Sequence, residues 1–243
     1  MNYLKAEHLK FKRTISNKLI FIIPSITAIL AWLIGGFTGF QYMTLYWWYS
    51  FLLPGAIAVF CLLSHRKEES AGKYYSVFSM PINLSKFEAA KSIILIEKLL
   101  ITALFLAMLI SISNIISPAI AVYSVWRSIT GSIGIILVSI WQIPLCLYLT
   151  RKMGIFVPVV LNTILGIVLS TAAALGNTIA WWFVPYCWAA KLAEPLMGIQ
   201  LNGTYSGNCG FSVNIPISIL LSMILFVVLS FINAKDFSRW EVK

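Results

Sequence analysis

The sequence predicts an all-α integral membrane protein with six transmembrane helices, an N-terminal interfacial helix, and a cytoplasmic helix between spans two and three. Two observations lead to this class. The chain is 60% hydrophobic and only 11% charged, whereas a soluble domain has about 25% charged residues. In addition, four long intervals contain no Asp, Glu, Lys, Arg or His, and a membrane-crossing helix needs about 20 apolar residues. These intervals are Leu19–Ser64, Leu99–Trp126, Ser128–Thr150 and Met153–Ala190.

The N-terminal segment Met1–Lys18 places apolar residues between Lys and Arg residues. With Leu4, Phe11 and Ile15 turned toward the lipid, it would form an amphipathic elbow helix lying on the inner leaflet. A solvated basic tail that serves only membrane topology would carry the same residues. The remaining residues, 19–243, are expected to form a single transmembrane domain.

The first two spans are predicted at Leu19–Phe37 and Leu45–Ser64, with a turn between them marked by Gly35, Gly36, Gly39 and Gln41. The second span begins with the aromatic run Tyr46–Tyr49. Because amphipathic rings settle at the depth of the lipid headgroups, this run is expected to form an interfacial belt.

Four further spans complete the predicted bundle: Ile93–Ile116, Ser128–Thr150, Gly154–Leu175 and Ile215–Asn233. Between the last two lies Asn177–Asn214, which is too long for a turn and is expected outside the cell. Its first half reads as a short interfacial or re-entrant helix.

Positive charge sets the orientation. Of the 18 Lys and Arg residues, 16 fall in segments on the side of the termini, and only Arg127 and Lys191 fall on the other side. By the positive-inside rule both termini are therefore cytoplasmic. The net charge of +10 is thus explained by topology and by anionic lipid headgroups, and no nucleic-acid partner is expected.

The longest polar interval between two spans is the cytoplasmic loop 65–91. A helix from Glu68 to Phe78 would begin with acidic residues, which favour a helix N-terminus. Along one face this helix would expose an apolar stripe, formed by residues at helical spacing. The stripe consists of Ala71, Tyr74, Tyr75 and Phe78, and the segment also contains Glu69, Gly72 and a break at Pro81. This helix would dock a cytosolic partner, although a plain loop joining two spans would have the same composition.

A second helix is expected to begin at Ser85, because Ser85 and Glu88 have the S-x-x-E spacing of a capping box. In that motif the Ser and Glu side chains bond each other's backbone N–H groups. Farther along the helix, Glu97 and Lys98 would extend to the headgroups or pair with neighbours.

The predicted external segment is rich in aromatic residues, with Trp181, Trp182, Tyr186 and Trp188. They would form an interface belt, or else contact an amphipathic ligand embedded in the lipid. The same segment contains Cys187 and Cys209, which can form a disulfide or remain free. Cys61 and Cys146 lie within spans and are expected to be packing residues.

No motif for catalysis or metal binding occurs in the sequence. There is no phosphate-binding loop, no HExxH, no GxSxG and no Cys/His metal spacing. A lipid-modifying enzyme would need clustered acids or histidines, and the only candidates, Glu97 and Glu194, are expected on opposite faces. The spans contain few polar groups, chiefly Gln142, Asn162 and Thr163. They are expected to form hydrogen bonds between helices, or else to bind a substrate. We therefore predict a protein that is not an enzyme and has no cofactor or metal of its own.

The arrangement resembles the permease subunits of ABC transporters of the ABC-2 export type. The resemblance extends over the whole chain and rests on the basic start Tyr3–Thr14, the six spans, the loop pattern of Glu68–Lys91 and the long external segment. Within that type the chain is similar to the small permeases of lantibiotic-immunity transporters. Permeases for bacitracin resistance share the same outline.

The resemblance implies a bacterial cell-membrane complex that removes antimicrobial peptides of the lantibiotic type from the membrane. Two permease chains, either identical or paired with a sister subunit, would sit on two cytosolic ATPase subunits, where ATP and Mg²⁺ would bind. The coupling helix would comprise Glu68, Glu69, Gly72, Tyr74, Tyr75 and Phe78, with the break at Pro81. Alternatives are export of another amphipathic substrate, such as a bacitracin-like antibiotic or a lipid, or a membrane sensory or structural subunit without transport.

Overall fold

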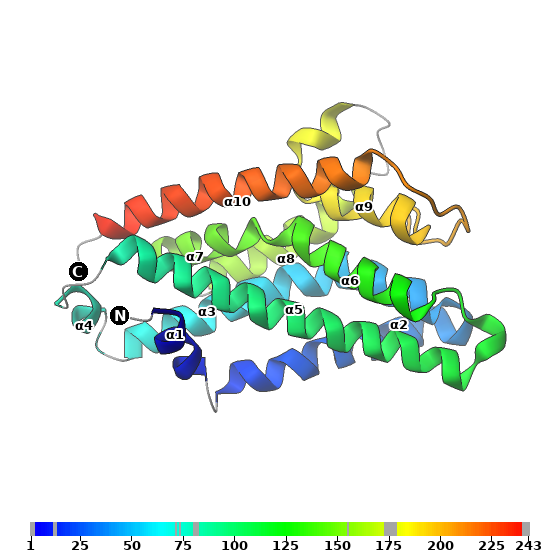
Figure 1. The fold of residues 1–243 in the computed structure, drawn as a ribbon, viewed down its shortest axis with the longest axis horizontal. Coiled ribbons are helices and arrows are strands. Elements are labelled where there is room, and N and C mark those ends of the chain that lie inside the picture. The colour runs from blue at the N-terminus through cyan, green and yellow to red at the C-terminus, as the bar shows by residue number, and fades with distance from the viewer. Residues whose placement is uncertain are drawn as a thin grey trace.

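The computed structural model describes residues 3–11, 14–70, 72, 74–79, 83–154, 156–172 and 179–239. Every regular element in this part of the chain is a helix, and the helices form an elongated bundle (Figure 1). Their bounds are α1 Tyr3–Phe11, α2 Ile15–Trp47, π-helix η1 Trp48–Leu52, α3 Leu53–Ser70, α4 Tyr75–Phe78, α5 Leu84–Ile116, 3-10 helix η2 Pro118–Ile120, α6 Val125–Ser139, α7 Gln142–Met153, α8 Phe156–Ala172, 3-10 helix η4 Ile179–Phe183, α9 Cys187–Met197 and α10 Asn214–Ser238.

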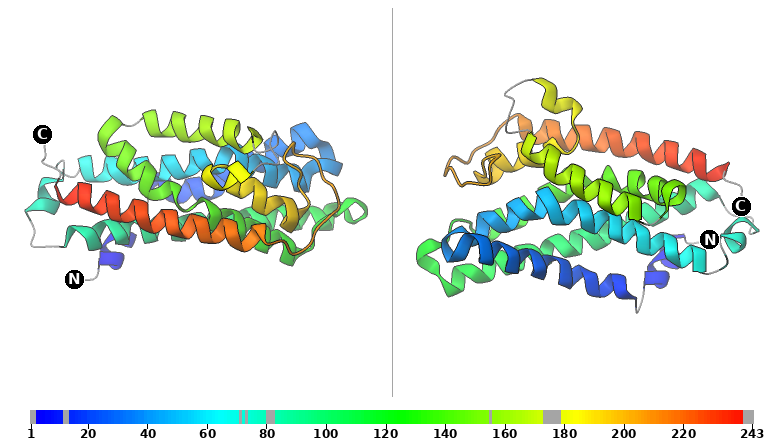
Figure 2. Two further views of the ribbon diagram at one scale, coloured as in Figure 1. Left: turned by 90° about the horizontal axis from the view of Figure 1, so that it is seen from above. Right: turned by 180° about the vertical axis from the view of Figure 1, so that it is seen from behind.

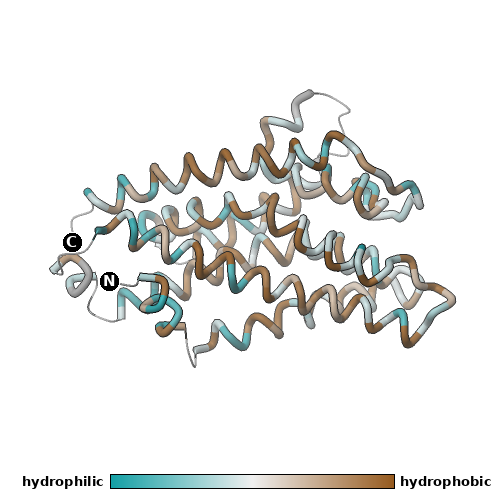
Figure 3. Tube along the Cα trace, in the orientation of Figure 1, coloured by the Kyte–Doolittle hydropathy of each residue, from teal (hydrophilic) through white to brown (hydrophobic). Residues whose placement is uncertain are grey.

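Within the described residues, 3 helical runs are long and apolar enough to cross a membrane: Ile15–Ser70, Leu84–Ile116 and Asn214–Ser238. A fourth is formed if α6 and α7, which are bent by 45°, count as one span. Hydrophobic residues follow the lengths of these helices (Figure 3). The all-helical, membrane-compatible class predicted from the sequence is confirmed at this level.

The first run changes direction at Gly36. This residue has φ 58° and ψ −159°, outside the helical region, and the positive φ is readily available to glycine. A Cβ atom on Gly35 would lie 3.0 Å from Met43 Cγ, so the chain folds back beside itself. Figures 1 and 2 show α2 and α3 running in opposite directions. The turn expected over residues 35–41 is therefore concentrated at Gly36, and Gln41 is helical.

The aromatic run at residues 46–49 is not an exposed belt. Trp48 is 0% exposed, and Tyr49 is also buried, both in the hydrophobic core. Both lie in the π-helix η1, which contacts α8 and α9. The belt prediction is wrong for these two residues because neighbouring helices, which the sequence alone does not place, surround them.

Helix α5 begins at Leu84, next to the predicted helix start at Ser85, and continues without a break through the third predicted span, Ile93–Ile116. Its N-cap is Asn83, whose side-chain oxygen accepts a hydrogen bond from Lys86 N at 3.0 Å. The expected capping box of Ser85 and Glu88 is therefore wrong. Asn83 satisfies the free N–H group of the first turn, and Glu88 forms buried ion pairs instead.

The fourth predicted span, Ser128–Thr150, is broken between α6 and α7. Pro144 explains the break. It has no N–H group to donate to Ile140 O four residues earlier, and Ile143 N bonds Ile140 O at 3.0 Å instead. The polar tail after the sixth predicted span also differs from expectation, because α10 continues to Ser238.

The terminal end of the bundle is where α1 and α4 lie and α10 ends, and the distal end is where η2 connects α5 to α6 (Figure 1).

Candidate functional site

The predicted coupling helix Glu68–Phe78 is not one helix. Helix α3 ends at Ser70, Gly72 has φ 109° and Tyr74 has φ 67°, and only one turn of helix, α4, follows. Two residues with positive φ interrupt any continuous helix. Glu68 and Glu69 therefore belong to the last turn of α3. Ala71 and Pro81 lie outside the described residues.

Of the predicted aromatic stripe, Tyr74 is buried in the bundle and is only 2% exposed. Its hydroxyl lies 2.8 Å from His65 Nδ1, and its ring packs edge-on against Phe237 of α10. Burial raises the pKa of Tyr74 to about 12. Phe78 is half-buried beside Phe237, with ring centroids 5.3 Å apart. Tyr75, in contrast, is 59% exposed.

The two predicted acidic coupling residues have different surroundings. Glu68 is buried, and its carboxylate lies 2.5 Å from Lys10 Nζ of α1. Lys10 also pairs with Glu7 at 2.5 Å, and Lys67 Nζ donates to Lys10 O at 2.6 Å. Glu68 therefore holds α1 against α3. Glu69 is exposed and remains available to a partner.

A buried charged centre that the sequence did not predict lies next to Tyr74. Glu88 of α5 pairs with Arg151 of α7 at 3.0 Å and with Lys91 at 3.4 Å. Asn233 of α10 donates to Glu88 Oε2 at 3.0 Å and also accepts a hydrogen bond from Arg151. The centre thus ties together three helices that are far apart in sequence.

Aromatic rings cover the cations of this centre. Lys91 Nζ lies 4.7 Å from the centroid of Phe87, and Arg151 Cζ lies 4.8 Å from that of Phe237. Lys91 also lies 5.4 Å from the ring of Tyr74. Such contacts stabilise buried cations. Because Phe237 also contacts Phe78, the centre is continuous with α4.

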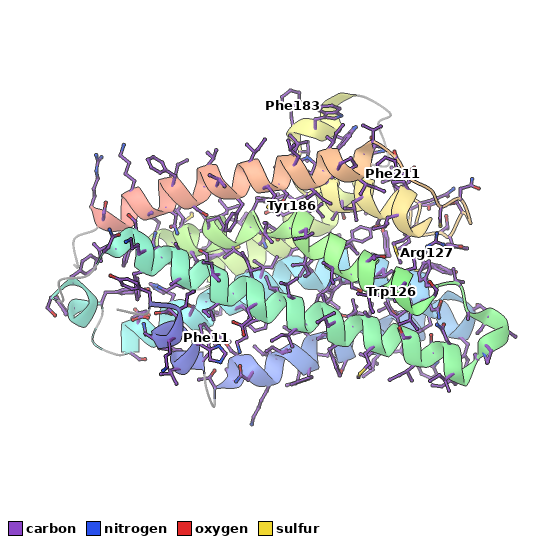
Figure 4. All side chains as sticks on the ribbon, in the orientation of Figure 1. Phe11, Trp126, Arg127, Phe183, Tyr186 and Phe211 are labelled. Carbon is purple, nitrogen blue, oxygen red and sulfur yellow. The ribbon has the colours of Figure 1, made fainter. Side chains whose placement is uncertain are left out.

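Helix α1 is shorter than the predicted elbow, because it ends at Phe11 and α2 begins at Ile15. Phe11 is buried against the protein, as Figure 4 indicates, while Leu4 and Ile15 are exposed. The expected shared apolar face of these three residues is therefore not formed by one helix.

Two charged residues of α5, Glu97 and Lys98, both contact residues of other helices. Glu97 lies 3.6 Å from His8 of α1, and Lys98 donates to Asn17 of α2 at 2.9 Å. This agrees with the expectation that they pair with neighbours.

The four aromatic residues predicted as a belt or ligand contact are divided between core and surface. Trp188 is buried and donates through Nε1 to Trp182 O at 3.2 Å. Tyr186 donates to Asn162 Oδ1 at 2.6 Å, and Figure 4 shows it reaching into the bundle. Trp182 is exposed and Trp181 partly so. Trp182 can therefore meet lipid or a ligand, Trp181 and Tyr186 can do so only in part, and Trp188 cannot.

The expected polar contacts between helices are confirmed for Asn162. Its Nδ2 donates to Gln142 Oε1 at 2.9 Å and to Pro54 O at 2.7 Å, which joins α8 to α7 and α3. Thr163 instead donates within its own helix, to Val159 O at 2.7 Å.

All four cysteines are free. Cys187 is buried and donates to Leu169 O at 3.0 Å, whereas Cys209 is partly exposed in the loop before α10. The disulfide alternative for Cys187 and Cys209 is therefore not realised. Cys61 and Cys146 are buried, as predicted.

A second polar centre, at the distal end, surrounds Gln41. Its Oε1 accepts hydrogen bonds from Val122 N and Tyr123 N, each at 2.8 Å. Its Nε2 donates to Ser113 Oγ at 2.8 Å and Asn114 Oδ1 at 2.5 Å. All four hydrogen-bonding positions of the amide are used. Gln41 thus fixes α2, α5 and the η2 connection to one another.

No group of three or more His, Cys, Asp or Glu residues that could hold a metal ion occurs in the part of the chain that the structure describes. The helices and their apolar surfaces define an all-helical protein suited to a membrane. Comparison with models of protein families, with curated proteins and with solved structures found no match.

Proposed function

We propose that the chain is the membrane permease subunit of an ATP-driven exporter of the ABC-2 type. The resemblance of its sequence pattern to that type supports this proposal. The observation that carries it is the exposed ring of Tyr75, presented on a short helix at the charged terminal end of the bundle (Figure 1). A water-exposed aromatic residue on a fixed support suits a protein contact.

The proposal includes six spans. They are residues 15–35 and 37–70, divided at Gly36, then α5, α6 with α7, α8, and α10. Helix α8 has 17 residues, which at about 1.5 Å per residue is slightly shorter than a bilayer core of about 30 Å. Both termini are cytoplasmic in this arrangement, α1 is the elbow at the inner leaflet, and the loop before α10 is external.

In this proposal fewer residues contact the ATPase than the sequence alone predicts. Tyr75 and Glu69 contact the partner, because Glu68 and Tyr74 are already engaged inside the chain. Phe78 supports α4 from behind through Phe237.

This arrangement also provides a route from the ATPase to the spans. A displacement of α4 would press on Phe237 and Tyr74, and through them on the ion pairs of Glu88. Those ion pairs join α5 to α7, and the hydrogen bonds of Asn233 join both to α10, so three spans would respond together.

The transported substrate in this proposal is a cationic, amphipathic antimicrobial peptide of the lantibiotic type, removed from the membrane. ATP and Mg²⁺ bind to the partner ATPase, and a second permease, either identical or a sister chain, completes the pore. The support is the family resemblance together with the apolar, lipid-compatible helices.

Co-purification of the ATPase tests the proposal. The chain is expressed in bacteria with its ATPase, and Tyr75→Asp is compared with Tyr75→Phe. A charge at the contact should abolish co-purification and peptide resistance. Phe should preserve both, because the aromatic ring itself provides the contact. If Tyr75→Asp retains the ATPase and full resistance, the proposed contact is wrong. If wild-type chain retains the ATPase without affecting resistance, it is a non-transporting subunit.

A further inference from the structure

An open hollow of about 550 Å³ lies at the distal end of the bundle, between the start of α6, the end of α9 and the loop before α10. This volume is in the range of about 300–1,000 Å³ that is usual for small-molecule sites. The lining residues include Ser124, Trp126, Arg127, Leu196, Phe211 and Ile215. Three separate segments therefore form its walls.

The wall that carries Phe211 is tied to α9. Gly210 N donates to Pro195 O at 2.9 Å, and Ser206 N donates to Gly198 O at 2.9 Å. The loop before α10 is thus held against the end of α9 by backbone hydrogen bonds, and the hollow is a feature of the folded chain.

Arg127 provides the charge in this hollow. At the distal end the other cation, Lys191, pairs with Glu194 at 3.5 Å, but Arg127 forms no ion pair among the described residues. The Ser124 hydroxyl beside it accepts from Arg127 N, which leaves its own hydrogen free to donate. A guanidinium group binds phosphate oxygens through paired, parallel hydrogen bonds. The polar side of the hollow therefore matches an anion.

The other side of the hollow is apolar and exposed. Trp126 is 76% exposed and Phe211 is 87% exposed, and both lie with Arg127 at the same end of the bundle (Figure 4). Rings this exposed would be unfavourable in water, but they are stable at the depth of lipid headgroups, where one side meets acyl chains. A ligand with a phosphate joined to acyl chains satisfies both sides.

We propose that this hollow binds the phosphate headgroup of a phospholipid from the leaflet at the distal end. Arg127 and the Ser124 hydroxyl contact the phosphate, and Trp126, Phe211 and Ile215 contact the upper acyl chains. The site requires that the chain lie in a membrane, but it does not require transport. It therefore goes beyond the proposed function and can fail separately.

Native mass spectrometry of the full chain, purified in an uncharged detergent, tests the proposal with two matched probes. One is phosphatidylglycerol, and the other is diacylglycerol with the same acyl chains but no phosphate. We expect tight binding of the first and weak binding of the second. Arg127→Gln should weaken phosphatidylglycerol binding about tenfold, because a charge-assisted hydrogen bond is lost, and Arg127→Lys should retain most of it. Lys18→Gln, which removes an exposed cation at the terminal end, should have no effect.

A photoreactive phosphatidylglycerol, labelled at the start of an acyl chain, locates the site in wild-type protein and does not depend on how a variant folds. Adducts should map to peptides that contain Trp126, Phe211 or Ile215. The proposal is overturned if the adducts map elsewhere. Equal binding of diacylglycerol, or unchanged phosphatidylglycerol binding by a correctly folded Arg127→Gln variant, would also overturn it. If Arg127→Gln leaves phosphatidylglycerol binding unchanged, the hollow would suit an uncharged ligand, such as an apolar segment of an external peptide.

Discussion

Glu88 of α5 and Arg151 of α7 form an ion pair at 3.0 Å inside the terminal end of the bundle, with side chains only 3% and 2% exposed. Removing one partner of a buried pair leaves the other charge without compensation, which costs about 3–5 kcal/mol. The pair is therefore expected to be essential to the packing of α5, α7 and α10.

Glu88→Gln should lower the free energy of unfolding of the detergent-solubilised protein by about 3–5 kcal/mol. The double variant Glu88→Gln, Arg151→Gln should be less destabilised than the sum of the two single variants. Lys152→Gln is the matched control, because its contact with Asp236 at 2.9 Å is partly exposed, and such pairs contribute about 0–1 kcal/mol. Additive losses in the double variant would show that the two residues do not act as a pair.

Ionisation of the Tyr74 phenol is expected to make the free energy of unfolding depend on pH in the alkaline range. Its pKa is raised from 10.0 to about 12 by burial. Below pH 10 the phenol is protonated in both folded and unfolded chains, so its contribution to stability is fully present. Between pH 10 and 12 the unfolded phenol ionises first, so about 2–3 kcal/mol is lost as pH rises through this window.

The Tyr74→Phe variant isolates this effect from that of other tyrosines. At pH 7 the variant should be less stable than wild type by about 1 kcal/mol, because the hydrogen bond to His65 is lost. As pH rises from 10 to 12 this difference should shrink and then reverse. Melting curves of the two proteins at each pH measure it, and a constant difference would mean that Tyr74 titrates normally.

Gln41 provides a test of the distal end. Gln41→Leu would leave Val122 N and Tyr123 N without their acceptor. We expect the free energy of unfolding to fall by about 2–4 kcal/mol, because each unpaired buried polar group costs about 1–3 kcal/mol. Ser25→Ala is a suitable control, since Ser25 is exposed and donates only within its own helix. Equal melting temperatures for wild type and Gln41→Leu would show that water replaces the amide.

Topology can be measured with a membrane-impermeant maleimide on intact cells. The background is Cys209→Ser, because Cys209 is the one cysteine that is not buried. Ser206→Cys in the loop before α10 should be labelled from outside, and Ser79→Cys after α4 only once the membrane is opened. The reverse pattern would invert the proposed orientation.

Much of the fold follows from composition and from the positions of turn residues such as Gly36. The predicted spans matched both ends of α8, the end of α5 and the start of α10 to within about a turn, because long apolar helices carry a strong local signal. The start of α5 and the end of α10 lie outside the predicted spans. The sequence failed where tertiary contacts decide. Trp48 and Tyr49 have the composition of an interfacial belt, yet they are buried because η1 contacts α8 and α9.

The candidate site was predicted less well for the same reason. Glu88 at S-x-x-E spacing suggests a helix cap, but Arg151 and Asn233 reach it from segments more than 60 residues away in the sequence. The i,i+3 spacing of Glu88 and Lys91 was the only local sign of an ion pair. Tyr74 belonged to a predicted exposed stripe, and only the positive φ at Gly72 and Tyr74 turns it inward.

The proposed contact between Tyr75 and a cytosolic ATPase is tested most directly by site-specific photo-crosslinking in intact cells. A photoreactive phenylalanine analogue is placed at position 75 and, as a control, at position 206 in the loop before α10. We predict a crosslink from position 75 to an ATP-hydrolysing protein and none from position 206. Absence of that crosslink at position 75, or an equal one at position 206, would contradict the proposed contact.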